Sequence, residues 1–176
     1  NEDFEKTDNI LSYESLEEKT PKSLNPEASK PKILIVDDNP DILNYLADIL
    51  SPAYHIYKAT DGEEGVREAV KHIPDLILSD VMMPIQDGIS LCKELKANIN
   101  TSHIPIILLT ARTSTVFEID GLKHGADDYI TKPFNADVVV ARIVSQLENR
   151  EKIKSHFLNK IRFEPQIEDL KTSESI

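Results

Sequence analysis

Charged and hydroxyl side chains close several apolar runs of this sequence. Asp37 and Asp38 directly follow the run ILIV, and Asp80 closes the run LILSD. Thr110 closes the run IILLT, and Lys132 follows the short run YIT. Carboxylates that share a site repel one another and raise one another's pKa, so crowded acids call for a cation among them. This set of residues therefore suits chemistry on an anion held by a metal ion and an ammonium group.

Magnesium is the cation that these residue types favour. Mg2+ prefers oxygen ligands and is usually held by one or two carboxylates together with phosphate oxygens. Zinc is disfavoured because no histidine or cysteine lies at ligand spacing around these positions. Asp37 and Asp38 form a natural metal pair, whereas Asp80 stands alone and is the best candidate for a nucleophile, since carboxylates form aspartyl phosphates. The metal and Lys132 would neutralise the phosphoryl oxygens, and Thr110 would donate a hydrogen bond to them.

Alternating strands and helices must position these side chains. Apolar runs rich in branched residues predict strands over 32–37, 54–60, 75–80, 103–111 and 126–134. Helical spacing predicts helices over 40–50, 61–72, 89–98 and 113–125, and a last helix from about Asn135. This alternation favours a doubly wound, five-stranded parallel sheet with helices on both faces. Ligands of such sheets collect at the carboxyl ends of the strands, where the candidate residues lie.

Composition excludes several classes of protein. The chain has 176 residues, of which 40% are hydrophobic, and its formal charge of -11 comes without a basic stripe. Direct binding of nucleic acid by this segment is therefore not expected, because phosphate neutralisation needs clustered Lys and Arg. The single cysteine, Cys92, rules out an internal disulfide framework and is compatible with a reducing compartment, so we expect a cytoplasmic segment. No apolar run approaches the roughly 18 residues of a membrane span, and no membrane contact is expected.

The segments on either side of this domain differ from it in amino-acid composition. Residues 1–31 are charged and rich in proline, and we interpret them as a tether with one short amphipathic stretch, Ile10, Leu11, Tyr13 and Leu16. The domain itself is expected over 32–150. Residues 151–176 predict an extension of the last helix, through Ile153, Phe157, Leu158 and Ile161, followed by a linker to a further module. Because the chain begins with Asn1, we interpret it as a piece of a larger protein.

Four motifs of the domain, in order and at matching intervals, resemble the response-regulator receiver domain of two-component signalling. They are ILIVDDNP, LILSDVMMPIQDG, IILLTA and GADDYITKPF. The resemblance implies a flavodoxin-like fold in which Asp80 accepts a phosphoryl group from the phosphohistidine of a histidine kinase. It also implies that Asp38 and Asp80 bind Mg2+ directly, together with the main-chain carbonyl of Met82. Asp37 matches the residue that supports the metal, often through water.

The same resemblance implies a switch and a set of partners. Thr110 and Lys132 match the residues that contact the phosphoryl oxygens, and Tyr129 matches an aromatic residue that turns inward when the hydroxyl binds phosphate. The surface of the fourth helix, fifth strand and fifth helix would then shift, and we hypothesise that it mediates homodimerisation or docking. The Lys132–Pro133 bond is expected to be cis. The flanks resemble the connectors of hybrid regulators, in which a histidine kinase core precedes the receiver and an AraC-type helix-turn-helix domain follows, so the output would be transcription.

Two other functions compete with this interpretation. One is a magnesium-dependent aspartyl-phosphate phosphatase with Asp37 as its nucleophile, but Asn39 occupies the place of the acid that this chemistry needs two residues later. The other is a receiver that is never phosphorylated and serves only as an interaction surface, which the intact set of key residues disfavours. In the leading interpretation the segment catalyses its own phosphorylation and dephosphorylation without being a stand-alone enzyme, while the parent chain carries the kinase.

Overall fold

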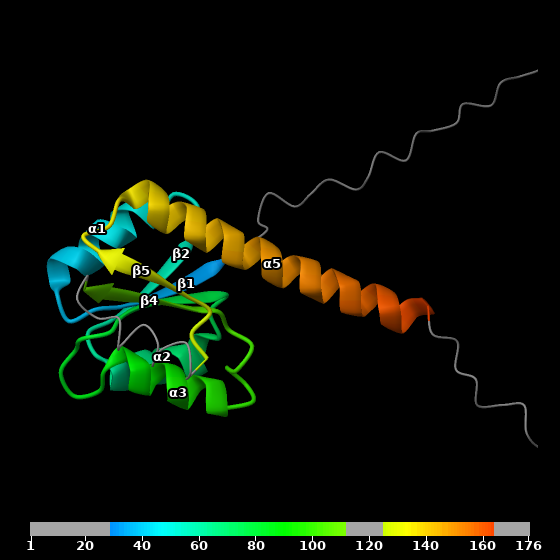
Figure 1. Cartoon of the computed structure of the whole chain (residues 1–176), viewed down its shortest axis with the longest axis horizontal. Coiled ribbons are helices and arrows are strands. Elements are labelled where there is room, and N and C mark those ends of the chain that lie inside the picture. Colours follow the sequence, from blue (N-terminus) through cyan, green and yellow to red (C-terminus); the bar gives the residue numbers. More distant parts are fainter. Residues whose placement is uncertain (1–28, 112–124, 164–176) are drawn as a thin grey trace, which may run out of the picture.

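A parallel sheet of five strands forms the centre of the computed structural model, which describes residues 29–111 and 125–163 (Figure 1). The strands lie in the order β2-β1-β3-β4-β5, and every neighbouring pair is parallel. Each strand of a parallel pair needs a crossover connection to the next, and the change of direction after β1 places helices on both faces. The bounds are β1 Lys32–Val36, β2 His55–Ala59, β3 Leu76–Asp80, β4 Ile106–Ala111 and β5 Asp128–Lys132.

Four helices are described, and local sequence explains where each of the first three begins. They are α1 Pro40–Leu50, α2 Gly62–His72, α3 Gly88–Ala97 and α5 Ala136–Phe163. The side chains of Asn39, Asp61 and Asp87 accept hydrogen bonds from backbone amides in the first turns of α1, α2 and α3, as N-caps do. The helix expected over 113–125 falls almost wholly outside the described residues, as does the amphipathic stretch of residues 10–16.

Two apolar layers lie on the two faces of the sheet, and strand periodicity sorts residues between them. Ile33 and Ile35 of β1 belong to the layer under α1 and α5, whereas Leu34 and Val36 belong to the layer under α2 and α3. All four are completely buried, as expected for the central strands of a sheet that is covered on both sides. The doubly wound, five-stranded parallel sheet expected from the sequence is confirmed.

The last helix is longer than the sheet that it covers. Val139 and Ile143 of α5 are completely buried on the sheet, but the helix continues past the edge of the domain as far as Phe163 (Figure 1). Its residues 151–161 are all exposed. None of the helices in the described ranges is both long and apolar enough to cross a membrane.

Candidate functional site

Strand periodicity brings three of the candidate residues to one place. Asp37, Asp80 and Lys132 lie at the carboxyl ends of β1, β3 and β5. Each stands two positions after a buried residue of the layer under α1 and α5, namely Ile35, Leu78 and Ile130. Side chains two positions apart in a strand point to the same face, so the three charged groups continue that face beyond the apolar layer. The register of the sheet therefore sets the position of the site.

The ammonium group of Lys132 lies between two buried carboxylates. Its Nζ is 3.3 Å from Oδ2 of Asp37 and 3.1 Å from Oδ1 of Asp80. Asp37 is only 1% exposed, and its other oxygen accepts a hydrogen bond of 2.9 Å from the backbone amide of Asn39. The ammonium group offsets part of the cost of burying two carboxylates side by side, because an unpaired buried charge is strongly unfavourable. The bond from Lys132 to Pro133 is cis, as the sequence led us to expect.

The surroundings of Asp80 act on the pKa of its carboxyl group. Burial raises the pKa of its carboxyl group, Lys132 opposes this rise through its charge and its hydrogen bond, and the carboxylate of Asp37 adds to it. A raised pKa makes a carboxylate more basic, provided that it is still ionised at neutral pH. Burial and Lys132 thus act on the pKa of Asp80 in opposite directions, and burial has the larger effect.

The third acid completes a set of oxygen ligands. Asp38 is exposed, and ligand atoms of Asp37, Asp38 and Asp80 all lie within 4.8 Å of one another. They are the only group of three or more potential metal-binding side chains among residues 29–111 and 125–163. Three carboxylates and no imidazole or thiolate fit a hard divalent cation such as Mg2+. The ammonium of Lys132 already bridges two of them, which indicates how strongly this place attracts positive charge.

The remaining candidates lie in β4, in β5 and in the loop that follows β3. Thr110 is 2% exposed, follows the register partner of Asp80 in β4, and donates a hydrogen bond of 3.4 Å to the carbonyl of Ala111. Tyr129 packs against the layer under α2 and α3. In the β4–β5 register, Thr110 pairs with the residue two positions after Tyr129, so both lie on the same face. Met82 is 62% exposed in the loop that follows β3.

Gly88 is a residue of the site that the sequence did not lead us to select. Its amide donates to the carbonyl of Val81, and a Cβ at this position would collide with the carbonyl oxygen of Asp80. The loop between β3 and α3 can fold back onto the strand end only because glycine has no side chain. The nearest signal in the sequence was the Pro/Gly-containing stretch VMMPIQDG, which predicted a loop but not this contact.

We expect Gly88→Ala to destabilise the fold by about 1–3 kcal/mol, the usual cost of overpacking. The backbone of Asp80 must shift to admit the methyl group, so phosphoryl capture should fall in the same variant. Denaturant titration and phosphorylation assays would measure the two effects. Ser90→Ala, on an exposed position of the same helical turn, is the matched control and should change neither. An unchanged stability of Gly88→Ala would show that the loop does not rest on the strand end.

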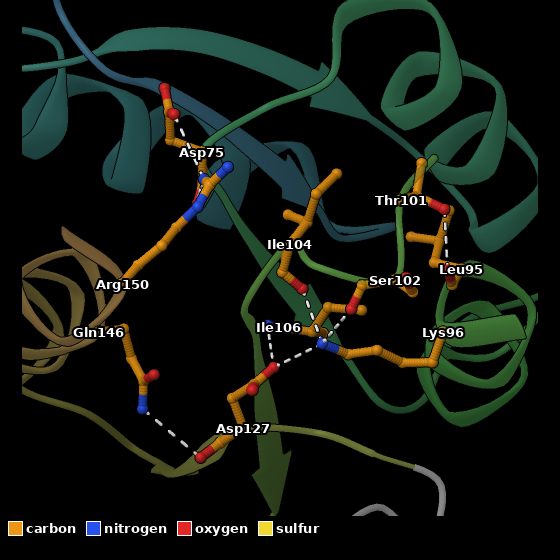
Figure 2. Close-up of polar contacts among 10 residues, drawn as sticks. All are labelled: Asp75, Leu95, Lys96, Thr101, Ser102, Ile104, Ile106, Asp127, Gln146 and Arg150. Atoms are coloured by element: carbon orange, nitrogen blue, oxygen red, sulfur yellow. Dashed lines mark hydrogen bonds and ion pairs between the residues drawn. The ribbon is translucent and has the colours of Figure 1, made fainter. Parts of the chain in front are cut away.

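Other acids and the single cysteine have structural roles. Asp61 and Asp87 are the N-caps of α2 and α3. Cys92 of α3 is completely buried, and burial raises the pKa of its thiol to about 11, which fits a packing role. At the other edge of the sheet, Asp127 accepts hydrogen bonds from the side chain of Lys96 and from the backbone amide of Ile106 (Figure 2). These hydrogen bonds, which hold the residue before β5 against α3 and β4, were not predicted because their partners are distant in the sequence.

Known proteins resemble this chain over the region that forms the sheet and its site. Residues 33–144 match the family model described as the response regulator receiver domain. A protein named histidine kinase P4 from Formosa agariphila is 40% identical over 164 residues, which are 89% of this chain and 12% of that protein. The DNA-binding dual master transcriptional regulator RpaA of Synechocystis is 40% identical over 124 residues, which are 70% of this chain and 52% of that protein.

Solved structures give the same result. The signal receiver domain of a signal transduction histidine kinase from Syntrophus aciditrophicus is similar with a TM-score of 0.64 and 34% identity, over 83% of this chain and 96% of that one. The curated relatives are much longer than the region matched, since this chain spans 12% of the first and 52% of the regulator. The likeness therefore concerns one domain of such proteins.

Proposed function

Because the chain belongs to the response regulator receiver family, we propose that it is a phosphoacceptor whose Asp80 takes a phosphoryl group from the phosphohistidine of a histidine kinase. The observation that carries this proposal is the position of Asp80, which is 7% exposed, 3.1 Å from Lys132 and within a group of three acids. A carboxylate in this setting can attack phosphorus while neighbouring positive charge balances the phosphoryl oxygens.

The transfer itself exchanges one bond to phosphorus for another. An oxygen of Asp80 attacks in line, the bond between phosphorus and the imidazole nitrogen breaks, and the nitrogen keeps the electron pair. Lys132 then contacts a phosphoryl oxygen as well as Asp37, because its Nζ already lies between the two acids. Asp37, Asp38, Asp80 and the main-chain carbonyl of Met82 would hold Mg2+. When bound, the metal supplies electrostatic stabilisation of the charge on the transferring group.

The proposed switch rests on the face shared by Thr110 and Tyr129. The hydroxyl of Thr110 donates a long hydrogen bond of 3.4 Å to the carbonyl of Ala111. A phosphoryl oxygen on Asp80 would accept a stronger, charge-assisted hydrogen bond from this hydroxyl in its place. Tyr129 is partly buried two positions before the register partner of Thr110, so it can fill the space that the threonine leaves. The surface around β5 and α5 would change with it and could serve a homodimer or another module.

Partners and output follow from the family and from the relatives. A histidine kinase is the expected donor, and the likeness to a part of a histidine kinase and of a DNA-binding regulator supports a place in a hybrid regulator of transcription. Residues 1–31 and 151–176 would then connect this receiver, 32–150, to the modules on either side. An aspartyl-phosphate phosphatase with Asp37 as nucleophile is less well supported, since Lys132 and the amide of Asn39 occupy both of its oxygens.

We expect the chain to take up one phosphoryl group from a small donor such as acetyl phosphate only when Mg2+ is present. The reason is that three neighbouring acids would repel the donor's negative charge unless a divalent cation neutralised them. Intact mass spectrometry with Mg2+ and with EDTA would measure the uptake, and hydroxylamine would release the label if the bond is an acyl phosphate. Equal uptake in EDTA would contradict the magnesium site, whereas no uptake under any condition would favour an interaction-only receiver.

A further inference from the structure

The part of α5 that leaves the domain carries an apolar face with no described partner. Ile153, Phe157, Leu158 and Ile161 are 59%, 59%, 53% and 72% exposed. At the helical repeat of about 3.6 residues, they lie on the side of the helix on which Val139 and Ile143 are buried. The stripe that packs on the sheet thus continues beyond it, where the described chain offers nothing to cover it. Single exposed apolar residues are common, but a continuous group of four indicates a partner.

A second copy of the helix in parallel is a poor occupant. The same face of α5 rests on its own sheet from Val139 to Leu147, so a parallel partner on that face would run into the domain. Charge opposes it as well, because residues 151–163 contain four basic residues and one acid. Two such segments side by side would repel each other, whereas an acidic apolar segment would be attracted.

The beginning of this chain has that chemistry. Residues 1–28 contain eight acids and three basic residues, and the stretch 8–18 combines Ile10, Leu11, Tyr13 and Leu16 with four acids and no Lys or Arg. These residues lie outside the described ranges, but the place where they join the domain is described. A spacer of residues 19–28 spans up to about 35 Å when extended, while α5 rises only about 16 Å from Arg150 to Ile161.

One carboxylate connects the place where the chain enters the domain with the place where α5 leaves it. One carboxylate oxygen of Asp75 accepts a hydrogen bond of 2.8 Å from the backbone amide of Lys32. The other forms an ion pair of 3.3 Å with the guanidinium group of Arg150. Arg150 also donates to the backbone carbonyl of Asp75 at 2.9 Å (Figure 2). Next to this link a groove of about 400 Å³, lined in part by Pro105, Ile153 and Lys154, leads toward the exposed face. A segment that enters at Lys32 therefore starts within reach of the stripe.

We propose that residues 8–18 of this chain pack on the apolar face formed by Ile153, Phe157, Leu158 and Ile161. The apolar side chains of the segment cover this face, and its acids lie near Lys152, Lys154 and Lys160. The contact joins the linker before the domain to the helix after it, so that a change in the position of one is transmitted to the other. It is independent of the chemistry at Asp80.

The test uses the full chain of 176 residues, which contains no tryptophan. Phe157→Trp places a single fluorophore in the proposed contact, and we expect blue-shifted emission and weak quenching by acrylamide. Adding Leu11→Asp and Leu16→Asp should shift the emission to the red and raise the quenching constant severalfold. Ser155→Trp lies on the opposite, exposed side of the helix and should report a solvated indole in both backgrounds. Circular dichroism and the melting midpoint would verify that each variant is folded.

Charge reversal provides an independent readout. Replacing Glu14, Glu17 and Glu18 by Lys should loosen the contact, and replacing Lys152, Lys154 and Lys160 by Glu in the same chain should restore it. The proposal is overturned if the indole at position 157 is solvated in the full chain, or if its burial is unaffected by the changes at 11 and 16. Burial that depends on protein concentration would also overturn it, since an antiparallel second copy would then be the occupant.

Discussion

Asp80→Asn is expected to abolish phosphoryl uptake from acetyl phosphate in the presence of Mg2+. The amide cannot attack phosphorus, and it removes one of the three carboxylates that would hold the metal. Intact mass measurement gives the occupancy directly. Asp61→Asn is the matched control, because Asp61 caps α2 by accepting a hydrogen bond of 2.9 Å from Glu64, and asparagine caps equally well. Full uptake by Asp80→Asn would place the phosphorylated residue elsewhere.

When no metal is present, the same substitution should make the folded chain more stable. Burial raises the pKa of Asp80 in the folded state, so folding disfavours its ionised form. The resulting loss of stability is absent below the ordinary pKa of an aspartate, about 3.9, and develops as pH rises through the raised folded pKa. Asparagine carries no charge to desolvate. In EDTA, Asp80→Asn should therefore melt at a higher temperature than the parent chain at neutral pH, and this advantage should shrink as pH falls.

Lys132→Met is expected to be the most destabilising of these changes in EDTA, by about 3 kcal/mol. It removes the cation that lies 3.3 Å from Asp37 and 3.1 Å from Asp80 but keeps most of the side-chain volume, so two buried acids lose their partner. Phosphoryl uptake should fall by roughly 100-fold, as when one preorganised donor is removed from a reacting oxyanion. Denaturant titrations in EDTA and rates of uptake in Mg2+ would measure the two effects.

Magnesium should restore much of the stability lost in Lys132→Met, because a cation bound to Asp37 and Asp80 replaces the missing ammonium group. The increase in melting temperature on adding Mg2+ is thus expected to be larger in this variant than in the parent chain. Lys71→Met is the control, since Lys71 is 67% exposed and its ion pair with Glu68 at 3.9 Å is a surface pair worth at most about 1 kcal/mol. Equal stabilities of the two variants would argue that Lys132 does not neutralise the acids.

Local patterns in the sequence were sufficient for much of this fold. Branched apolar runs predicted all five strands, and helical spacing predicted the helices that the structure describes, because both patterns repeat within a few residues along the chain. The start of a helix depends on equally local contacts, since Asp61 accepts a hydrogen bond from a backbone amide only three residues away. Asp37, Asp80 and Lys132 could be placed at one edge because the carboxyl ends of parallel strands must lie together.

Only the tertiary structure decided which of the acids is buried and which is exposed. The sequence suggested that Asp37 and Asp38 form a pair, and carboxylate oxygens of the two do lie within 4.8 Å of each other, but the surroundings of the two side chains differ. Asp37 is buried against Lys132, 95 residues away, while Asp38 is exposed. Likewise, the link from Arg150 to Asp75 spans 75 residues, and no periodicity along the chain encodes it. Local order follows from the spacing of residue types, whereas contacts between distant segments exist only once the strands have taken their order and register in the sheet.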